Sequence, residues 1–136
     1  MFKRVLVLVK ATKGSERAIE VACDLTSQLG GTVHLIAVDF DGNADKTGPE
    51  VLEKAANTCN SKGINATYSM HRANSKEDVA ATIAAISAGY DLIVMGHCRY
   101  KKIYRFLHYS LAEDLITLAA CPVIVAAIDC PEKNVI

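Results

Sequence analysis

Short, almost wholly apolar runs recur along this chain, and segments with the spacing of amphipathic helices separate them. The clearest runs are Val5–Val9, Val33–Val38, Asp91–Met95 and residues 123–128. A continuous apolar run of this length is typical of a strand buried on both faces, as strands are in a parallel sheet covered by helices. The alternation of such strands with helical segments therefore predicts an α/β fold.

Turn and capping residues indicate where the intervening helices begin and end. Serine or threonine stands at each expected helix start: Ser15, Thr47, Ser75 and Ser110. A glutamate three residues after two of them completes a capping-box pattern: Glu50 and Glu113. Glycines follow the first two helices, as expected where a helix ends in a left-handed residue: Gly30 and Gly63.

A further strand is expected near Ala66–His71, where the low apolar content suits the edge of a sheet. Five strands joined by four helices through right-handed crossovers predict one doubly wound domain over residues 1–136, with a parallel sheet in the order 3-2-1-4-5. The topological switch point then falls between strands one and four. We therefore expect any small-molecule site at Val9-Lys10-Ala11 and Met95-Gly96, where those strands end.

Composition and charge exclude several classes of protein. Fifteen basic and fifteen acidic side chains cancel, so no overall field favours nucleic acid or an anionic membrane as a partner. No apolar run is long enough to span a membrane. Lys10 interrupts the apolar start of the chain, which lacks the cleavage site of a signal peptide. A soluble, cytoplasmic protein is the expectation.

The five cysteines are dispersed and form no Cys-x-x-Cys pair. This pattern indicates neither a disulfide framework nor a zinc cage, and it favours a reduced compartment. Cys23 and Cys59 fall on predicted helix faces and are interpreted as ordinary core residues. Cys98 lies beside a basic segment that would lower its pKa, which makes it the thiol to test for redox chemistry.

The segment 91–127 carries most of the functional information. An apolar strand is expected to end at Gly96, and a basic, glycine-poor loop leads from it to Ser110 and the last helix. A strand, a loop and a helix N-terminus in this order form anion or nucleotide sites in open α/β sheets. The side chains in the loop therefore decide whether a nucleotide fits.

Several of these motifs resemble the universal stress protein family, in order and spacing, over nearly the whole chain. They are the opening Val-Leu-Val-Leu-Val, the Gly14-Ser15-Glu16 helix start, the strand ending at Gly96 and the stretch from Ser110 to Cys121-Pro122-Val123-Ile124-Val125. The resemblance implies a single domain with the adenine nucleotide alpha hydrolase-like fold. It also implies a stress-response protein that forms homodimers through its last strand.

One branch of that family binds ATP or AMP through a Gly-x2-Gly-x9-Gly-Ser/Thr loop and an aspartate after strand one. Here Arg99 and Tyr109 replace two of the three glycines, and Lys10 stands in place of the aspartate. A β-carbon obstructs the close approach of phosphate to backbone amides, and a lysine cannot accept a bond from a ribose hydroxyl. The chain thus resembles the universal stress protein A-like branch, which lacks the nucleotide loop.

An alternative remains open, in which a divergent member binds nucleotide or phosphate through basic side chains instead of glycines. Arginine recognises phosphate bidentately, and a helix N-terminus favours anions. Arg99, Lys102 and Ser110 would then contact the phosphates of ATP or AMP. The full set of candidate residues for this alternative is Lys10, Val38, Met95, Gly96, Arg99, Lys102, Tyr109 and Ser110.

Other chemistries find less support in the sequence. His97 and Cys98 are adjacent and have no acidic neighbours to complete a metal site. Asp39 and Asp41 follow a strand, as ribose-binding carboxylates do, but the Gly-x-Gly-x-x-Gly motif is missing. His34 and His71 have no partner suggesting a base or nucleophile, and no catalytic triad is evident. We therefore predict a protein that is not an enzyme and carries no metal or cofactor.

The last strand offers a surface of a different kind. As an edge strand that is apolar on both faces, it leaves backbone groups unpaired and can be covered by a second copy across a two-fold axis. The residues expected at this dimer edge are Val123, Ile124, Val125, Ala126 and Ala127. The sequence therefore predicts a homodimeric stress-response or regulatory module, with a protein as a possible further partner.

Overall fold

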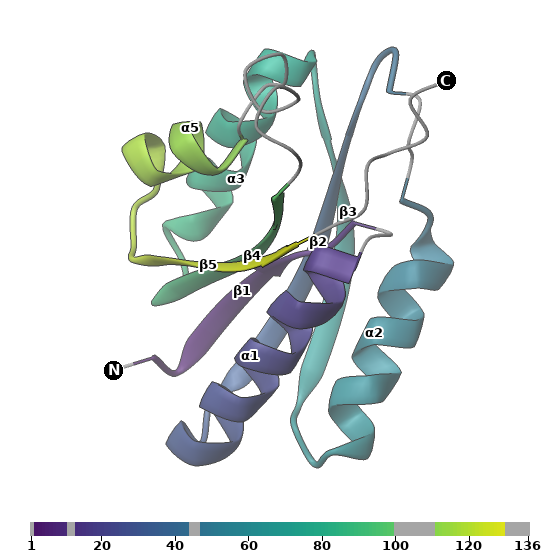
Figure 1. The fold of residues 1–136 in the computed structure, drawn as a ribbon, viewed down its shortest axis with the longest axis vertical. Helices are drawn as coiled ribbons and strands as arrows, with labels where there is room; N and C mark the ends of the chain where they lie inside the picture. Colours follow the sequence, from purple (N-terminus) through teal and green to yellow (C-terminus); the bar gives the residue numbers. More distant parts are fainter. Residues whose placement is uncertain (1, 11–12, 44–46, 100–110, 130–136) are drawn as a thin grey trace.

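The computed structural model describes residues 2–10, 13–43, 47–99 and 111–129. Five parallel strands form one sheet in the order β3-β2-β1-β4-β5, which confirms the predicted topology (Figure 1). The strands are β1 (Arg4–Leu8), β2 (Thr32–Phe40), β3 (Ala66–Ala73), β4 (Leu92–Arg99) and β5 (Val123–Asp129). The α-helices in the described residues are α1 (Lys13–Leu29), α2 (Pro49–Ser61), α3 (Val79–Ser87) and α5 (Leu111–Leu118), and a 3-10 turn, η1 (Lys76–Asp78), precedes α3.

Helices cover both faces of this sheet, as the right-handed crossovers require. Helices α1 and α2 lie on one face, and α3 and α5 lie on the other (Figure 1). Successive residues of β1 point to opposite faces, so Val5 and Val7 pack under α1 and α2 while Leu6 and Leu8 pack under α3 and α5. This double burial explains why β1 reads as a continuous apolar run.

Strand β4 is longer than the sequence indicated. The apolar run ends at Met95, but the strand continues through Gly96 to Arg99, and each added residue has a partner in β5 from Ala126 to Asp129. Our expectation that the strand ends at Gly96 was therefore wrong, because backbone pairing with β5 extends the strand past its buried part. Strand β2 likewise continues past Val38 to Phe40, which places Asp39 in the strand.

The capping predictions were only partly correct. Helix α1 begins at Lys13, and Ser15 lies inside its first turn, where its hydroxyl accepts a bond from the Lys10 N–H at 2.7 Å. Gly48 is the N-cap of α2, and no side-chain cap bond forms there, so the predicted capping box of Thr47 and Glu50 is absent. Ser75 caps η1, and its hydroxyl donates to the Asp78 carboxylate at 2.9 Å. Ser110 lies outside the described residues.

Two glycines end helices as predicted. Gly30 follows α1 with φ +71° and Gly63 follows α2 with φ +77°, in the left-handed region that glycine enters without steric cost. The chain turns sharply at each and enters the next strand. Among the described residues, no helix combines the length and hydrophobicity that crossing a bilayer requires.

Candidate functional site

The carboxyl ends of β1 and β4 lie side by side, as the predicted site requires. Leu8 pairs with Met95 on one side and with Ile36 on the other, so Lys10, Gly96 and Val38 follow at the same edge of the sheet. Met95 is buried and Lys10 is exposed. The predicted residues Lys102, Tyr109 and Ser110 lie outside the described part of the chain.

The backbone after Met95 is extended. Residues Gly96 to Arg99 pair with Ala126 to Asp129 of β5, and the Arg99 guanidinium donates to the Asp129 carboxylate at 2.9 Å. Successive N–H groups of a strand point in opposite directions, whereas a phosphate cradle needs several that converge. Within the described residues, the segment after Gly96 has the geometry of a paired β-strand.

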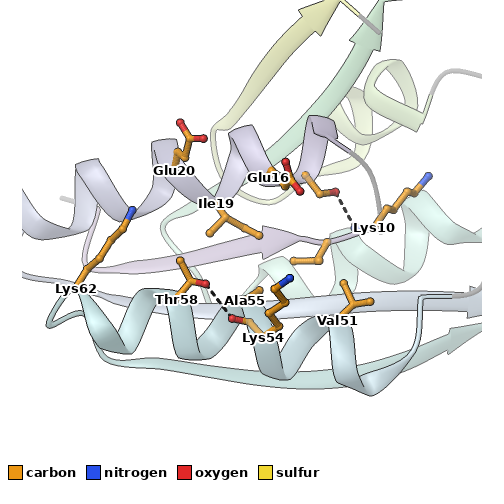
Figure 2. A pocket seen from close by; sticks show the side chains of 11 residues that line it. Lys10, Glu16, Ile19, Glu20, Val51, Lys54, Ala55, Thr58 and Lys62 are labelled. Atoms are coloured by element: carbon orange, nitrogen blue, oxygen red, sulfur yellow. Dashed lines mark hydrogen bonds between the residues drawn. The ribbon is translucent and has the colours of Figure 1, made fainter. Parts of the chain in front are cut away.

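A cavity of about 640 Å³ opens beside this edge, between α1 and α2 (Figure 2). Its apolar lining comes from Val9, Ile19, Val51 and Ala55, and its polar lining comes from Lys10, Ser15, Glu16, Glu20, Lys54, Thr58 and Lys62. A volume of this size is within the range of small-molecule sites. The groove has an apolar floor and a charged rim, which suits an amphipathic ligand.

The charges on this rim are mixed. Glu16 and Glu20 lie on α1, whereas Lys54 lies on α2 and Lys62 directly follows that helix and extends toward α1 (Figure 2). Glu20 also forms an ion pair with Arg17 at 3.0 Å. Three lysines against two glutamates give only a weak positive excess, so the groove lacks the concentrated charge of a phosphate site.

The sequence analysis included Lys10 among the candidate residues, but it did not predict a groove between α1 and α2. Its two walls are the facing sides of α1 and α2, which are 36 residues apart in the chain at Cys23 and Cys59. The available signal was the i, i+4 spacing of Glu16 and Glu20 on one helix and of Lys54 and Thr58 on the other, since such pairs share a helix face.

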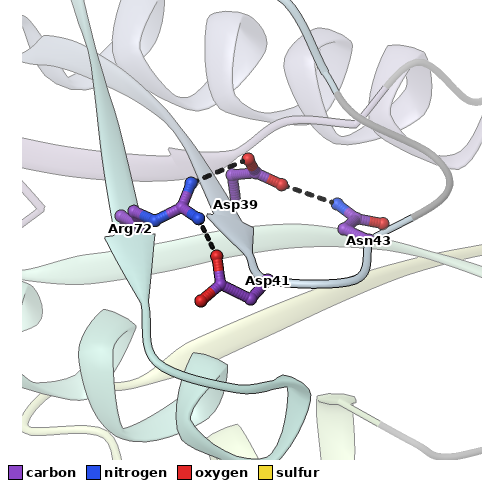
Figure 3. A network of polar contacts seen from close by, with 4 residues as sticks. All are labelled: Asp39, Asp41, Asn43 and Arg72. Atoms are coloured by element: carbon purple, nitrogen blue, oxygen red, sulfur yellow. Dashed lines mark hydrogen bonds and ion pairs between the residues drawn. The ribbon is translucent and has the colours of Figure 1, made fainter.

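Two acidic residues at the end of β2, Asp39 within the strand and Asp41 just after it, pair with an arginine. Arg72 of β3 contacts Asp39 at 3.3 Å and also pairs with Asp41, while Asn43 donates to Asp39 at 3.1 Å (Figure 3). The Asp39 side chain is only 15% exposed, whereas that of Asp41 is 78% exposed. Through Arg72, these carboxylates tie the ends of β2 and β3 together.

Two histidines that appeared isolated in sequence are joined by one serine. The Ser69 Oγ lies 2.8 Å from Nε2 of His34 and 2.8 Å from Nε2 of His71, and the Thr67 hydroxyl lies 2.6 Å from Nδ1 of His34. The registers of β2 and β3 place them together, because His34 pairs with Thr67 and Val38 with His71. Neither the register nor this contact is legible in the sequence.

The environment of His34 favours the neutral imidazole. Burial lowers the pKa of His34 first, and the nearby charges of His71 and Arg4 lower it further. A neutral His34 has one donor nitrogen and one acceptor nitrogen, so it can donate to one of the two hydroxyls, of Thr67 and Ser69, and accept from the other. In a cationic ring both nitrogens would be donors. The Tyr90 ring stacks on the His34 ring, with the two ring centroids 6.0 Å apart, and the Arg4 guanidinium lies over the Tyr90 ring.

Cys23 and Cys59 are buried in the core, as predicted, but Cys98 differs from its predicted role. Cys98 is disulfide-bonded, whereas Cys23, Cys59 and Cys121 are free thiols. Cys98 is therefore not the reactive free thiol that we expected from its basic neighbours. Among the described residues, no group of three or more histidine, cysteine or acidic side chains is arranged to hold a metal ion.

Comparison with known proteins now decides the family. The model of the universal stress protein family matches residues 1–127. This chain belongs to the universal stress protein family. The match covers nearly the whole sequence, including every described strand except the last two residues of β5, and no curated protein matches the chain.

Solved universal stress proteins share the fold at low sequence identity. A family member from Burkholderia pseudomallei is 22% identical, with a TM-score of 0.64 over 95% of this chain and 97% of its own. A universal stress protein from Archaeoglobus fulgidus, solved in complex with dAMP, is 19% identical, with a TM-score of 0.66 over 92% and 97%. A further solved universal stress protein, in complex with cAMP, is 14% identical to this chain, with a TM-score of 0.67 over 92% of this chain and 97% of its own.

Proposed function

We propose that this universal stress protein is a cytoplasmic regulatory module of the stress response, which acts through protein contacts and does not hold ATP or AMP in a glycine-lined cradle. The observation that carries this proposal is the extension of β4 through Arg99 in register with β5. Backbone amides in a strand alternate in direction, so they cannot surround a phosphate as those of a glycine-rich loop do.

The charged side chains near this edge support the same conclusion. Arg99 is paired with Asp129, and Asp39 and Asp41 are paired with Arg72. Lys10, in place of a ribose-binding carboxylate, has no acceptor for a sugar hydroxyl. We assign no catalytic role, since the two histidines near Ser69 are both held on the sheet by contacts to its hydroxyl.

Isothermal titration calorimetry with ATP and with AMP, each with and without magnesium, tests this proposal. We expect no saturable heat up to millimolar nucleotide. A dissociation constant in the micromolar range would overturn the proposal. Release of inorganic phosphate from ATP would instead show a catalytic activity that the proposal excludes.

A second function is favoured by the cavity and by the neighbours solved with nucleotides. In this alternative the chain binds an adenine nucleotide at the edge marked by Lys10 and Gly96, next to the groove of about 640 Å³. If calorimetry detects binding, the variant K10A tests its location: a nucleotide at the predicted edge should bind more weakly to K10A, because Lys10 lies at that edge. The matched control is K54A, which removes a lysine from α2 on the opposite wall of the groove.

We further propose that the protein is a homodimer joined through β5. In the described residues β5 pairs with β4 alone, so one side of its backbone is open. Val123, Ile124 and Val125 are half-buried, Ala126 is buried and Ala127 is exposed. Pairing with a second copy would satisfy the open backbone groups and cover the apolar side chains. Sedimentation velocity tests this: we expect a species of twice the 14.6 kDa chain mass, and a monomer at micromolar concentration would refute it.

A further inference from the structure

Two buried thiols face each other across the two helices on one side of the sheet. Cys23 lies on α1 and Cys59 lies on α2, and their sulfur atoms are 3.1 Å apart. Their relative exposures are 1% and 0%, so both are enclosed in the core between the helices and the sheet. The sequence interpretation treated both as ordinary core residues and gave no sign of this contact.

The separation of the sulfurs is short enough for chemistry between them. A disulfide has an S–S distance of about 2.05 Å, so the two sulfurs need to approach by only about 1 Å to form one. Each cysteine lies on a helix face that packs into the core: Ala22, directly before Cys23, and Ala56, one turn before Cys59, are also buried. The helices therefore hold the thiols together continuously, without a loop that must fold back.

The two thiols differ in acidity in a way that assigns their roles. The hydrogen bond from Cys59 lowers the pKa of Cys23 to about 7, and the charge of Lys62 also lowers it, although burial opposes both. The same hydrogen bond raises the pKa of Cys59, and burial raises it further. Cys23 is therefore the more acidic of the two thiols, and Cys59 is the one that donates its proton in the bond between them.

We propose that Cys23 and Cys59 form a redox site that hydrogen peroxide converts into a disulfide linking α1 to α2. The Cys23 thiolate attacks one peroxide oxygen, the O–O bond breaks, and a sulfenic acid and hydroxide result. The Cys59 sulfur then attacks the Cys23 sulfur, its proton leaves, and the hydroxyl departs as water. In sum, two thiols and one peroxide give one disulfide and two waters.

The crosslink would act on the groove between the helices. Ile19 and Glu20 line the groove one turn before Cys23, and Thr58 lines it next to Cys59. A bond between the sulfurs fixes the spacing of the two walls at that end, where Lys62 extends toward α1. The site thus couples the oxidation state to the shape of the cavity, whichever ligand or partner the groove receives.

Peptide mapping of the wild-type protein tests the proposal directly. The purified chain is treated with graded hydrogen peroxide, remaining thiols are blocked with iodoacetamide, and the digest is analysed by mass spectrometry without reduction. We expect a peptide pair linked through Cys23 and Cys59, lighter by two hydrogen atoms and separated by dithiothreitol. Recovery of both cysteines in blocked form, at peroxide doses that already oxidise Cys121, would overturn the proposal.

Variants separate this bond from the other cysteines. Cys23→Ala and Cys59→Ala should each abolish the linked peptide, whereas the matched control Cys121→Ala, at the other free thiol of the described residues, should retain it. Oxidation should raise the thermal midpoint of the wild type by about 10 °C, because the new bond closes a long loop. Cys23→Ala keeps the Cys98 disulfide, so the same rise in that variant would also overturn the proposal.

Discussion

The two edge strands of the sheet, β3 and β5, differ in the side chains that they carry. Strand β3 carries an exposed Arg72 and a network of hydroxyls and histidines around Ser69, although Tyr68 and Met70 are also exposed on it. Strand β5 is apolar, and four of its first five residues are half-buried or buried without a described neighbour on its outer side. Charged and polar side chains on an edge discourage pairing with another chain, whereas an apolar edge invites it. Of the two edges, β5 is therefore the one that favours the association we proposed, and the charge and hydroxyls of β3 oppose it.

The largest expected effect comes from breaking the inner side of β5. The Ile93 N–H donates to the Pro122 carbonyl at 2.9 Å, and the alternation of a parallel ladder then directs the Ala126 N–H toward β4. The substitution Ala126→Pro removes that donor from a buried position and leaves its acceptor unsatisfied. We expect the free energy of unfolding to fall by about 2–3 kcal/mol. Urea denaturation at a fixed protein concentration measures it, and an unchanged midpoint would contradict the assigned register.

Moving the same substitution by one residue should affect association instead. The Ala127 N–H points to the open edge and its side chain is exposed, so Ala127→Pro leaves the bonds to β4 intact. We expect the dimer dissociation constant to rise about 100-fold, or by about 2.7 kcal/mol. Sedimentation velocity measures the change, and circular dichroism checks that the fold is kept. A dimer of unchanged affinity would show that β5 is not the interface.

The difference between the two edges also explains what the sequence could predict. Apolar runs such as Val5–Val9 report burial on both faces, so the order of strands and the edge position of β5 followed from periodicity and the rules of parallel crossovers. The prediction ended strand β4 at Gly96, three residues too early, because backbone pairing with β5 holds its last residues and backbone pairing leaves no apolar pattern in the sequence.

Contacts between distant residues were out of reach for a related reason. The meeting of His34 with Ser69 depends on the register of β2 against β3, and that of Cys23 with Cys59 depends on how two helices pack. The apolar pattern of β3 is too weak to specify its register against β2, and the packing of two helices depends on the three-dimensional fit of side chains. The Ser110 capping box and the loop before it lie outside the described residues, so that part of the candidate site stays a prediction.

The serine that links the two histidines tests whether the β3 side is stabilised by its polar network. Replacing Ser69 with alanine removes the shared partner of both Nε2 atoms, which then depend on solvent. We expect a loss of about 1 kcal/mol in the free energy of unfolding, because the site is partly buried. Thr67→Ala, which removes one exposed contact to His34, should cost less in the same urea experiment. Equal losses would argue that Ser69 has no special role.

The same network predicts how stability depends on pH. Because the folded state lowers the pKa of His34 below its usual 6.5, the unfolded chain binds more protons as the pH falls through that value. Stability contributed by neutral His34 is therefore complete above the unfolded pKa and is lost as the pH falls from 6.5 toward the folded pKa. His34→Gln should remove this slope, whereas substitutions on β5 should keep it. Thermal midpoints measured between pH 5 and 8, in steps of about half a unit, report the difference. A wild-type midpoint that rises on acidification would reverse the predicted sign.

The smallest expected effect concerns the arginine at the end of β3. Arg72 joins Asp39 and Asp41, but its side chain is 59% exposed, so water and salt screen both contacts. Arg72→Ala should lower the free energy of unfolding by less than about 1 kcal/mol, and the loss should shrink as sodium chloride is raised from 0.05 to about 0.5 M. Asp41→Ala is the matched control, because it removes only the more exposed of the two partners: the Asp41 side chain is 78% exposed and that of Asp39 is 15% exposed. Asp41→Ala should lower the free energy of unfolding by less than Arg72→Ala does. A salt-independent loss of several kcal/mol would mean that the β3 edge is held by this network as firmly as β5 is held by its backbone pairing, and the contrast between the two edges would then fail.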